Sequence, residues 1–223
     1  MSRARSMISP YPAVDRPGSS ANAKASLLRN DGSLILPTPR VSGGKALLQT
    51  LKERRTHREF SRERLPMQLL SDLLWAAFGI NRRSTRGRTA PSAEGCQEID
   101  IFVALHEGVY VFDALRHALM FRQKEDVRAR TGMQDFVAEA PLELVYVADF
   151  ARMHDASDAD KLMYSAADAG FIGQNVYLFC ASEGLATVVR GLVDRLPLSR
   201  VLELRPEQRI VLAQTVGFPP NSA

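Results

Sequence analysis

The sequence has little cysteine and no apolar run long enough to cross a membrane. Its two cysteines, Cys96 and Cys180, form no CxxC motif and no cluster with the four histidines, so neither a disulfide scaffold nor a metal site is predicted. No segment approaches the roughly 18 uncharged apolar residues that a membrane helix needs. Arg3 and Arg5 are not followed by an apolar core, so we expect no secretory signal and a cytoplasmic protein without a membrane partner.

Aromatic residues are also scarce, at 7% of 223 residues, and the acidic residues are unevenly placed. Residues 1–88 carry 17 Lys and Arg against 6 Asp and Glu, whereas residues 89–223 carry 12 against 19. The basic half predicts an anionic partner, which is either nucleic acid or a phosphorylated cofactor. The low aromatic content and the lack of a groove-reading motif argue against nucleic acid.

The apolar fraction of 45% is sufficient for one domain with a core. Residues 1–41 hold five of the twelve prolines and lack periodicity, which predicts an extended or flexible N-terminal arm that drapes over a partner subunit. Residues 42–223 are interpreted as a single domain. The absence of strict βαβ alternation favours an α+β fold. Predicted helices cover 44–55 (capped by Ser42, with Leu47, Leu48 and Leu51 on one face), 66–78, 158–183 and 195–204; predicted strands cover 99–105, 109–112, 142–148, 185–190 and 210–216.

The long helix over 158–183 is small or apolar on nearly all sides. Ser157 is positioned to cap its beginning and Gly184 to end it. A helix of this composition is buried on most sides, either in the domain centre or in a subunit interface.

Three segments carry residues suited to ligand binding. Arg54, Arg55, Thr56 and Arg58 offer guanidinium and hydroxyl donors that match phosphate oxygens, although a solvated basic helix end is an equally simple interpretation. The small residues of 88–97 allow a flat ligand to approach the backbone, or they form an ordinary turn. Residues 184–191 form either a strand that presents backbone N–H groups or a buried strand and turn.

Taken in order, these segments resemble the FMN-dependent nitroreductase family, and most closely its thiazoline-oxidase-like (SagB-type) branch. The family pattern Arg-Arg-Ser-x-Arg-x-Phe appears here over 54–60, with Thr56 in place of Ser. The likeness covers about residues 42–219. The other matching segments are Leu73–Gly79, Arg88–Ala93, Gly170 with Gln174-Asn175, and Gly184–Gly191.

The resemblance implies a nitroreductase-like three-layer α-β-α fold with a central mixed, mostly antiparallel sheet. It also implies a homodimer that binds two FMN molecules at its subunit interface. The implied reaction is a ping-pong hydride transfer from NADH or NADPH, through flavin N5, to a nitroaromatic, quinone or similar flat small molecule. No catalytic side chain and no metal are implied.

The resemblance also implies roles for single residues in the cofactor phosphate site. Arg54 and Arg58 would neutralise the FMN phosphate, helped by Arg55 and the Thr56 hydroxyl. Many relatives add a basic residue in a C-terminal extension, whereas this chain carries none after Gly217.

A second implied group of residues surrounds the isoalloxazine ring. Pro91, Ser92 and Ala93 would line it from the other subunit, with Gln97 near its pyrimidine edge. Gly95 stands where relatives often have Asn, so a side-chain contact to the flavin is lost here.

The third implied group lies on the strand before Gly191. Val188 and Val189 would pack on one ring face, and the backbone N–H groups of Arg190 and Gly191 would face flavin N5 and O4. Arg190 stands where some relatives have Glu, which predicts a more cationic mouth of the site.

Three alternatives stay open at this point. The chain could be an azoline (thiazoline or oxazoline) dehydrogenase of peptide maturation, acting with a partner complex. It could be a nucleic-acid-binding protein that uses its basic half, with binding that falls steeply as salt rises. It could also store or degrade FMN without a second substrate.

Overall fold

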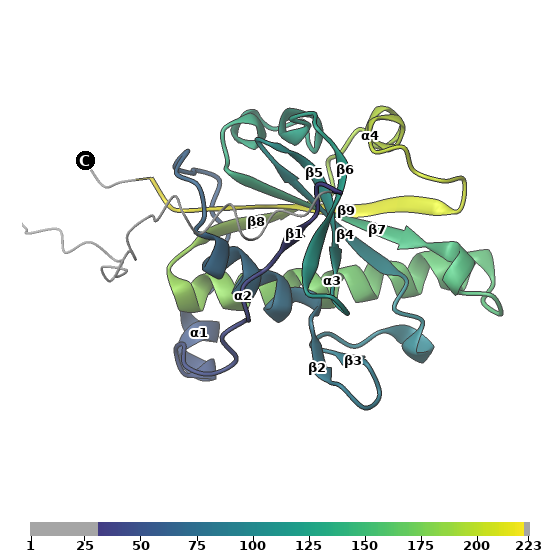
Figure 1. The fold of residues 1–223 in the computed structure, drawn as a ribbon, viewed down its shortest axis with the longest axis horizontal. Helices are drawn as coiled ribbons and strands as arrows, with labels where there is room; N and C mark the ends of the chain where they lie inside the picture. Colours follow the sequence, from purple (N-terminus) through teal and green to yellow (C-terminus); the bar gives the residue numbers. More distant parts are fainter. Residues whose placement is uncertain (1–30, 221–223) are drawn as a thin grey trace, which may run out of the picture.

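The computed structural model describes residues 31–220, which form one seven-stranded sheet with helices on both faces (Figure 1). Every strand pair within these residues is antiparallel. The strand β7 (Leu142–Asp149) lies in the interior of the sheet, and all of its residues are buried. In sheet order the strands are Leu34–Ile35 (β1), Ala118–Gln123 (β6), Gly108–Asp113 (β5), Ile99–Leu105 (β4), Leu142–Asp149 (β7), Gln208–Gly217 (β9) and Ala186–Arg190 (β8).

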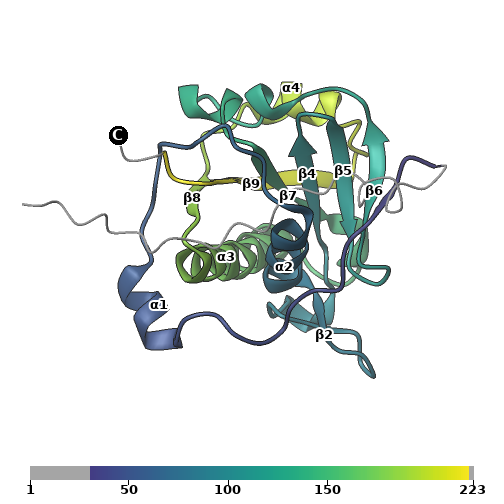
Figure 2. The same cartoon turned by 60° about the vertical axis from the view of Figure 1, so that its left-hand side comes forward.

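Two helices, α2 (Met67–Phe78) and α3 (Asp158–Glu183), pack against one sheet face, and Figure 2 shows them below the strands. The helix α4 (Arg195–Val201) covers the other face together with the short 3₁₀ turns Arg128–Arg130 (η3) and Asp135–Ala138 (η4). Each face has its own apolar cluster, because alternate strand residues point to opposite sides. The expected α+β fold with three layers is confirmed, and the sheet, which was expected to be mixed and mostly antiparallel, has only antiparallel pairs among the described strands.

The helix α2 follows the predicted pattern closely. Pro66 precedes its first residue and Gly79 ends it. Its apolar stripe enters the core, where each fully buried leucine contributes about 1.5–3 kcal/mol of transfer free energy. The buried apolar residues of the stripe are Leu69, Leu70, Leu73, Leu74, Ala77 and Phe78.

The helix α3 also begins and ends where predicted. The Ser157 side chain accepts a hydrogen bond from the Asp160 N–H, and Gly184 adopts a left-handed conformation with φ of 72°. One side of α3 packs in the core. The opposite side leaves large apolar side chains exposed, namely Leu162, Met163 and Phe171. Within the described chain, α3 is therefore buried on one side only, and its other apolar side chains face solvent or a partner.

The first helix, α1 (Leu47–Glu53), is shorter than predicted. Ala46 precedes it, so Ser42 is not its cap. Its three leucines do not enter the core of the described chain: Leu47, Leu48 and Leu51 are 64%, 79% and 46% exposed.

Some residues before the predicted domain boundary at residue 42 pack against the domain. The strand β1 pairs with β6, which the sequence patterns did not predict, and Leu36 is buried in the core. The Arg40 N–H and guanidinium both donate to the Asp72 carboxylate of α2, at 2.8 and 2.7 Å. Residues 33–40 are therefore part of the domain. The remainder of the expected arm, residues 1–30, lies outside the described residues.

A short hairpin lies outside the seven-stranded sheet. It pairs β2 (Ile80–Arg82) with β3 (Gly87–Arg88) directly after α2. Within residues 31–220, no helix combines the length and apolarity required to span a membrane.

Candidate functional site

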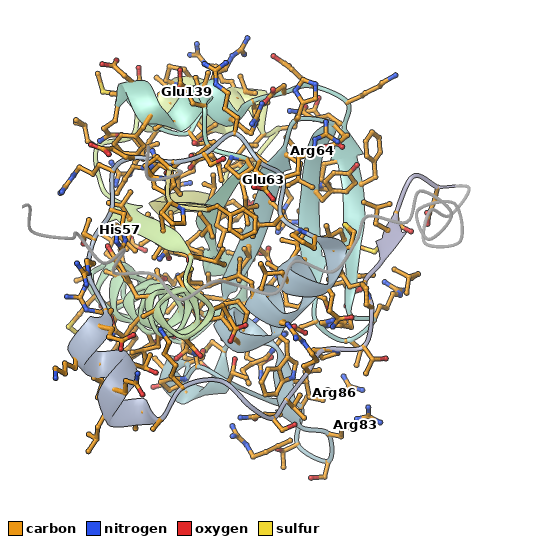
Figure 3. The ribbon with its side chains drawn as sticks, turned by 90° about the vertical axis from the view of Figure 1, so that its left-hand side faces the viewer. His57, Glu63, Arg64, Arg83, Arg86 and Glu139 are labelled. Carbon is orange, nitrogen blue, oxygen red and sulfur yellow. The ribbon has the colours of Figure 1, made fainter. Side chains whose placement is uncertain are left out.

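The basic segment that follows α1 lies along the free edge of β8. The strand β8 is the last strand of the sheet, so its outer edge is not paired with another strand. The His57 N–H donates to the Thr187 carbonyl oxygen of β8 at 3.0 Å. Figure 3 labels His57 on this side of the molecule. Two of the predicted segments, 54–58 and 184–191, are therefore adjacent in one chain.

Tyr177 of α3 connects these two segments through its hydroxyl. The Val189 N–H donates to the Tyr177 oxygen at 3.0 Å, which leaves the tyrosine hydroxyl hydrogen for Thr56 Oγ1 at 3.1 Å. The Arg54 guanidinium lies 5.3 Å from the centre of the Tyr177 ring, in range of a cation–π contact. Sequence reasoning missed Tyr177. The only signal was a polar-tipped residue on an otherwise small and apolar helix.

The extended backbone of 54–58 sends neighbouring side chains to opposite sides. Glu53, Arg55 and His57 line a cavity of about 240 Å³ between α1 and the end of α3, whereas Arg54 and Thr56 contact Tyr177. Arg55 is therefore separated from the other members of the predicted phosphate clamp. Burial lowers the pKa of His57, which favours its neutral form beside Arg55.

Within residues 31–220, no carboxylate forms an ion pair with Arg54, Arg55 or Arg58. Arg55 and Arg58 are exposed, and Arg54 is half-buried. The three guanidiniums lie within five residues and repel one another, and of the three only Arg55 is attracted by the nearby Glu53, so a bound anion would stabilise the segment.

The backbone of β8 alternates between groups that face β9 and groups that face outward. The Thr187 C=O and the Val189 N–H both bond to groups outside the sheet, so the backbone C=O and N–H groups of these two residues point away from β9. Arg190, which pairs with Ala213, directs its N–H toward β9. Of the two predicted backbone donors, only that of Gly191 lies beyond the last strand pair, where the residue is exposed.

The side chains of the two valines of β8 point to opposite faces of the sheet. Val189 lies against Gly173 of α3, since a Cβ at Gly173 would come 3.1 Å from a Val189 methyl. Val188 is buried and, as its strand neighbour, points to the opposite face of the sheet. A flat ring could therefore contact both only at the strand edge.

The prediction of a cationic mouth formed by Arg190 is wrong. Its side chain is 2% exposed and forms an ion pair with the fully buried Glu143 of β7. Burial raises the pKa of Glu143 to about 7, although the neighbouring Arg190 acts to lower it. The charge lies inside the protein because β8 turns this side chain toward the α4 face.

The segment 91–97 is shaped by a different part of α3. The Ala93 N–H donates to Asp168 at 2.9 Å, and Ser92 Oγ accepts from the Gln97 N–H at 2.7 Å. Pro91 and Gly95 are exposed, and Gly95 has a φ of +71°.

Gln97 is occupied within its own chain. Its amide oxygen accepts from Arg88 Nε at 2.8 Å, and its amide nitrogen donates to the Arg86 carbonyl at 3.1 Å. The predicted contact between Gln97 and a ring edge would require one of these bonds to open.

The segment 91–97 and the β8 edge lie well apart in one chain. Their anchors on α3, Asp168 and Tyr177, are nine residues apart, which corresponds to about 13.5 Å of helical rise. One chain thus assembles two of the three predicted segments and leaves the third apart.

Comparison with known proteins decides the family. The family model described as the Nitroreductase family matches residues 51–218. The chain belongs to the nitroreductase family. It is 30% identical over 170 residues to a "putative nitroreductase" of Methanocaldococcus jannaschii, covering 71% of this chain and 85% of that protein.

Solved structures of nitroreductases share this fold. A "putative nitroreductase" of Ralstonia eutropha is 40% identical, with a TM-score of 0.82 over 96% of this chain and 100% of that one. The NADPH:FMN oxidoreductase of Vibrio harveyi, complexed with NAD⁺, is 19% identical, with a TM-score of 0.59 over 78% of this chain and 69% of that one. The second likeness is one of fold alone.

Proposed function

We propose that this nitroreductase-family protein is an FMN-dependent NAD(P)H oxidoreductase that reduces a nitroaromatic, quinone or similar flat acceptor. The observation that carries the proposal is the basic segment 54–58 held against the β8 edge beside Gly191. The fold shared with the NADPH:FMN oxidoreductase of Vibrio harveyi supports a flavin with a nicotinamide as reductant.

The residues of this edge fit a flavin mononucleotide. A phosphate requires positive charge and hydrogen-bond donors, and Arg54, Arg58 and the Thr56 hydroxyl offer both. The ring requires a flat approach to backbone donors, and the exposed Gly191 has no side chain to block it. The chemistry that FMN supplies when bound is hydride transfer through its N5 from NADH or NADPH to the acceptor.

The side chains of this protein have binding and orienting roles in the proposed reaction. Arg54 and Arg58 would hold the phosphate. Tyr177 fixes Thr56 and the β8 edge relative to each other. The Gly191 N–H would stabilise negative charge on the bound ring, because a preorganised dipole needs no rearrangement during the reaction.

The proposed site is completed by a second copy of the chain. The segment 91–97 lies too far from the β8 edge to serve a ring bound there in the same chain, so Pro91, Ser92 and Ala93 of one protomer would line the site of its partner. The exposed apolar residues of α1 and α3 offer the surface for such a homodimer.

An absorbance spectrum of the purified protein tests this function. We expect the bands of an oxidised flavin, which bleach when NADH or NADPH is added without oxygen. The absence of such bands, both as purified and after addition of FMN, would overturn the proposal. Bands that neither nicotinamide bleaches would exclude the NAD(P)H oxidoreductase function and direct attention to a partner reductant.

A further inference from the structure

The side chains of the buried Arg190–Glu143 ion pair have no role in the predicted site, yet the Arg190 guanidinium is fully hydrogen-bonded. All five N–H groups of the Arg190 guanidinium have acceptors. Nε donates to Thr215 Oγ1 at 3.0 Å, and Nη1 donates to the Thr131 carbonyl at 2.9 Å and to Gln134 Oε1 at 3.4 Å. Nη2 donates to Thr131 Oγ1 at 3.2 Å and to the Glu143 carboxylate.

The surrounding chain leaves room for this guanidinium. A Cβ atom at Gly132 would lie 1.7 Å from Arg190 Nη1, a distance that no side chain can tolerate. The backbone of Gly132 is not in the left-handed region, so its conformation does not require glycine. Glycine is required at this position because the Arg190 guanidinium occupies the space that a side chain would need.

Stability by itself is a poor explanation for such a pair. Both charges must be stripped of water, and an apolar pair of similar volume stabilises a core as well or better. The pair instead restricts conformation, because a guanidinium whose five N–H groups all have acceptors can adopt only one orientation. It connects the end of β8 to β7, to β9 and to the segment between η3 and η4.

That end of β8 is where the protein presents Gly191. Arg190 is the last residue of an edge strand, and the ends of edge strands open readily when nothing holds them. On the other side of Gly191, the Val193 N–H donates to the Gly191 carbonyl at 3.0 Å, and Val193 packs into the core cluster beneath α4. Gly191 is thus an exposed residue between two buried anchors.

We propose that Arg190 is a positioning residue which, held by Glu143, fixes the direction of the Gly191 N–H. The inference rests on the proposed function, in which this N–H faces the flavin ring. It assigns to Arg190 a role through its buried side chain rather than through its own N–H or a charge at the mouth of the site.

A double variant separates positioning from stability. In Arg190→Met with Glu143→Leu, an apolar pair of similar size replaces the ions, so we expect the protein to fold. We expect FMN affinity to change little, because the phosphate-binding residues are intact. Amide hydrogen exchange at Arg190, whose N–H is directed toward β9, should accelerate in the flavin-free protein, and flavin reduction by nicotinamide should slow on the order of tenfold or more.

If the double variant does not fold, the same measurements can be made on two single variants, Arg190→Lys and Glu143→Gln. Arg190→Lys keeps the charge and loses the fork of donors, so intermediate exchange and reduction rates are expected. Arg205→Met is the matched control, since it removes an ion pair to the buried Asp149 at the other end of β7. It should leave amide exchange at the end of β8 and the reduction rate unchanged.

The outcomes distinguish the two proposals. If the wild-type protein binds no flavin, the proposed function fails, while amide exchange at the end of β8 in the flavin-free variants still tests the anchoring. If the wild-type flavin is reduced, and the Arg190 and Glu143 variants match the wild type in both this exchange and the reduction rate, the positioning role of Arg190 is overturned.

Discussion

Single side chains determine how the basic segment meets the sheet. Tyr177 shows this most directly, because its hydroxyl accepts from the strand β8 and donates to Thr56. Neither contact could be predicted from the sequence, since Thr56, Tyr177 and Val189 lie far apart in the chain. The local spacing identified the arginines, and the tertiary structure decided which of them point toward the β8 edge.

Tyr177→Phe should disturb both segments. It leaves the Val189 N–H without its acceptor and removes the partner of Thr56, so we expect a loss of about 1–2 kcal/mol in the free energy of unfolding and weaker FMN binding. Urea unfolding and a flavin titration measure these effects. Tyr164→Phe on the same helix is the control, and an equal response of both variants would contradict the role of Tyr177.

Arg54→Ala and Arg55→Ala should differ, although the residues are neighbours. Arg54 lies over Tyr177 toward the proposed phosphate site, and its loss should weaken FMN binding by about 1–3 kcal/mol. Arg55 lines the cavity on the other side of the segment, and its loss should weaken binding by less than about 0.5 kcal/mol. Fluorescence titration with FMN decides, and equal losses would place both guanidiniums on the phosphate.

The burial of Glu98 predicts that the free energy of unfolding falls as pH rises. It is fully buried, and burial, together with the neighbouring Asp168, raises its pKa above the ordinary value of 4.5. The folded state therefore favours the protonated acid, whose stabilisation is complete below the unfolded pKa and is lost as pH rises through the folded one. Glu98→Gln should remove this loss. The test is to measure the unfolding free energies of the wild type and of Glu98→Gln from below the unfolded pKa to above the folded one. Parallel curves for the two proteins would refute the role of Glu98.

At the scale of elements, apolar periodicity predicted the long units well. The helices α2 and α3 and the strands β4, β7 and β9 lie where predicted, because each buries a continuous stripe or run. The short elements β1, β2, β3 and β6 were missed. A two-residue strand such as Leu34–Ile35 has no period of its own and forms only because a neighbour offers an edge.

Leu36→Ala tests whether the segment after β1 belongs to the domain. Leu36 is 4% exposed within the core, so the cavity left by its side chain should cost about 2–4 kcal/mol of unfolding free energy. Val41, further along the same segment, is 64% exposed, and Val41→Ala should change stability by less than about 0.5 kcal/mol. Similar effects of the two variants in chemical denaturation would mean that residues 33–40 do not hold the fold together.

At the scale of the molecule, one protomer leaves two kinds of surface incomplete. The β8 edge has the basic segment and Gly191 but lacks the residues of 91–97. The helices α1 and α3 expose large apolar side chains, and such a surface is uncommon on a protein that works alone. A homodimer would resolve both features with one interface.

Phe171→Glu should therefore weaken self-association. Phe171 is 48% exposed on the outer side of α3, and a charge placed there opposes burial against a second copy. We expect the mass measured by light scattering to fall from dimer to monomer, with loss of bound FMN. Leu115→Glu, in the turn between β5 and β6, should keep the wild-type mass; a Phe171→Glu variant that stays dimeric would place the interface elsewhere.

The sequence by itself determined the fold class, the long elements and the three segments suited to ligand binding. These depend on local periodicity and on residue types within a few positions of one another. Only the tertiary structure decided that Arg55 and Arg190 turn away from the β8 edge, that Val188 and Val189 face opposite sides, and that Tyr177 joins two segments. The physical reason is that side-chain direction depends on strand register and edge position, which are set by contacts between residues distant in the chain.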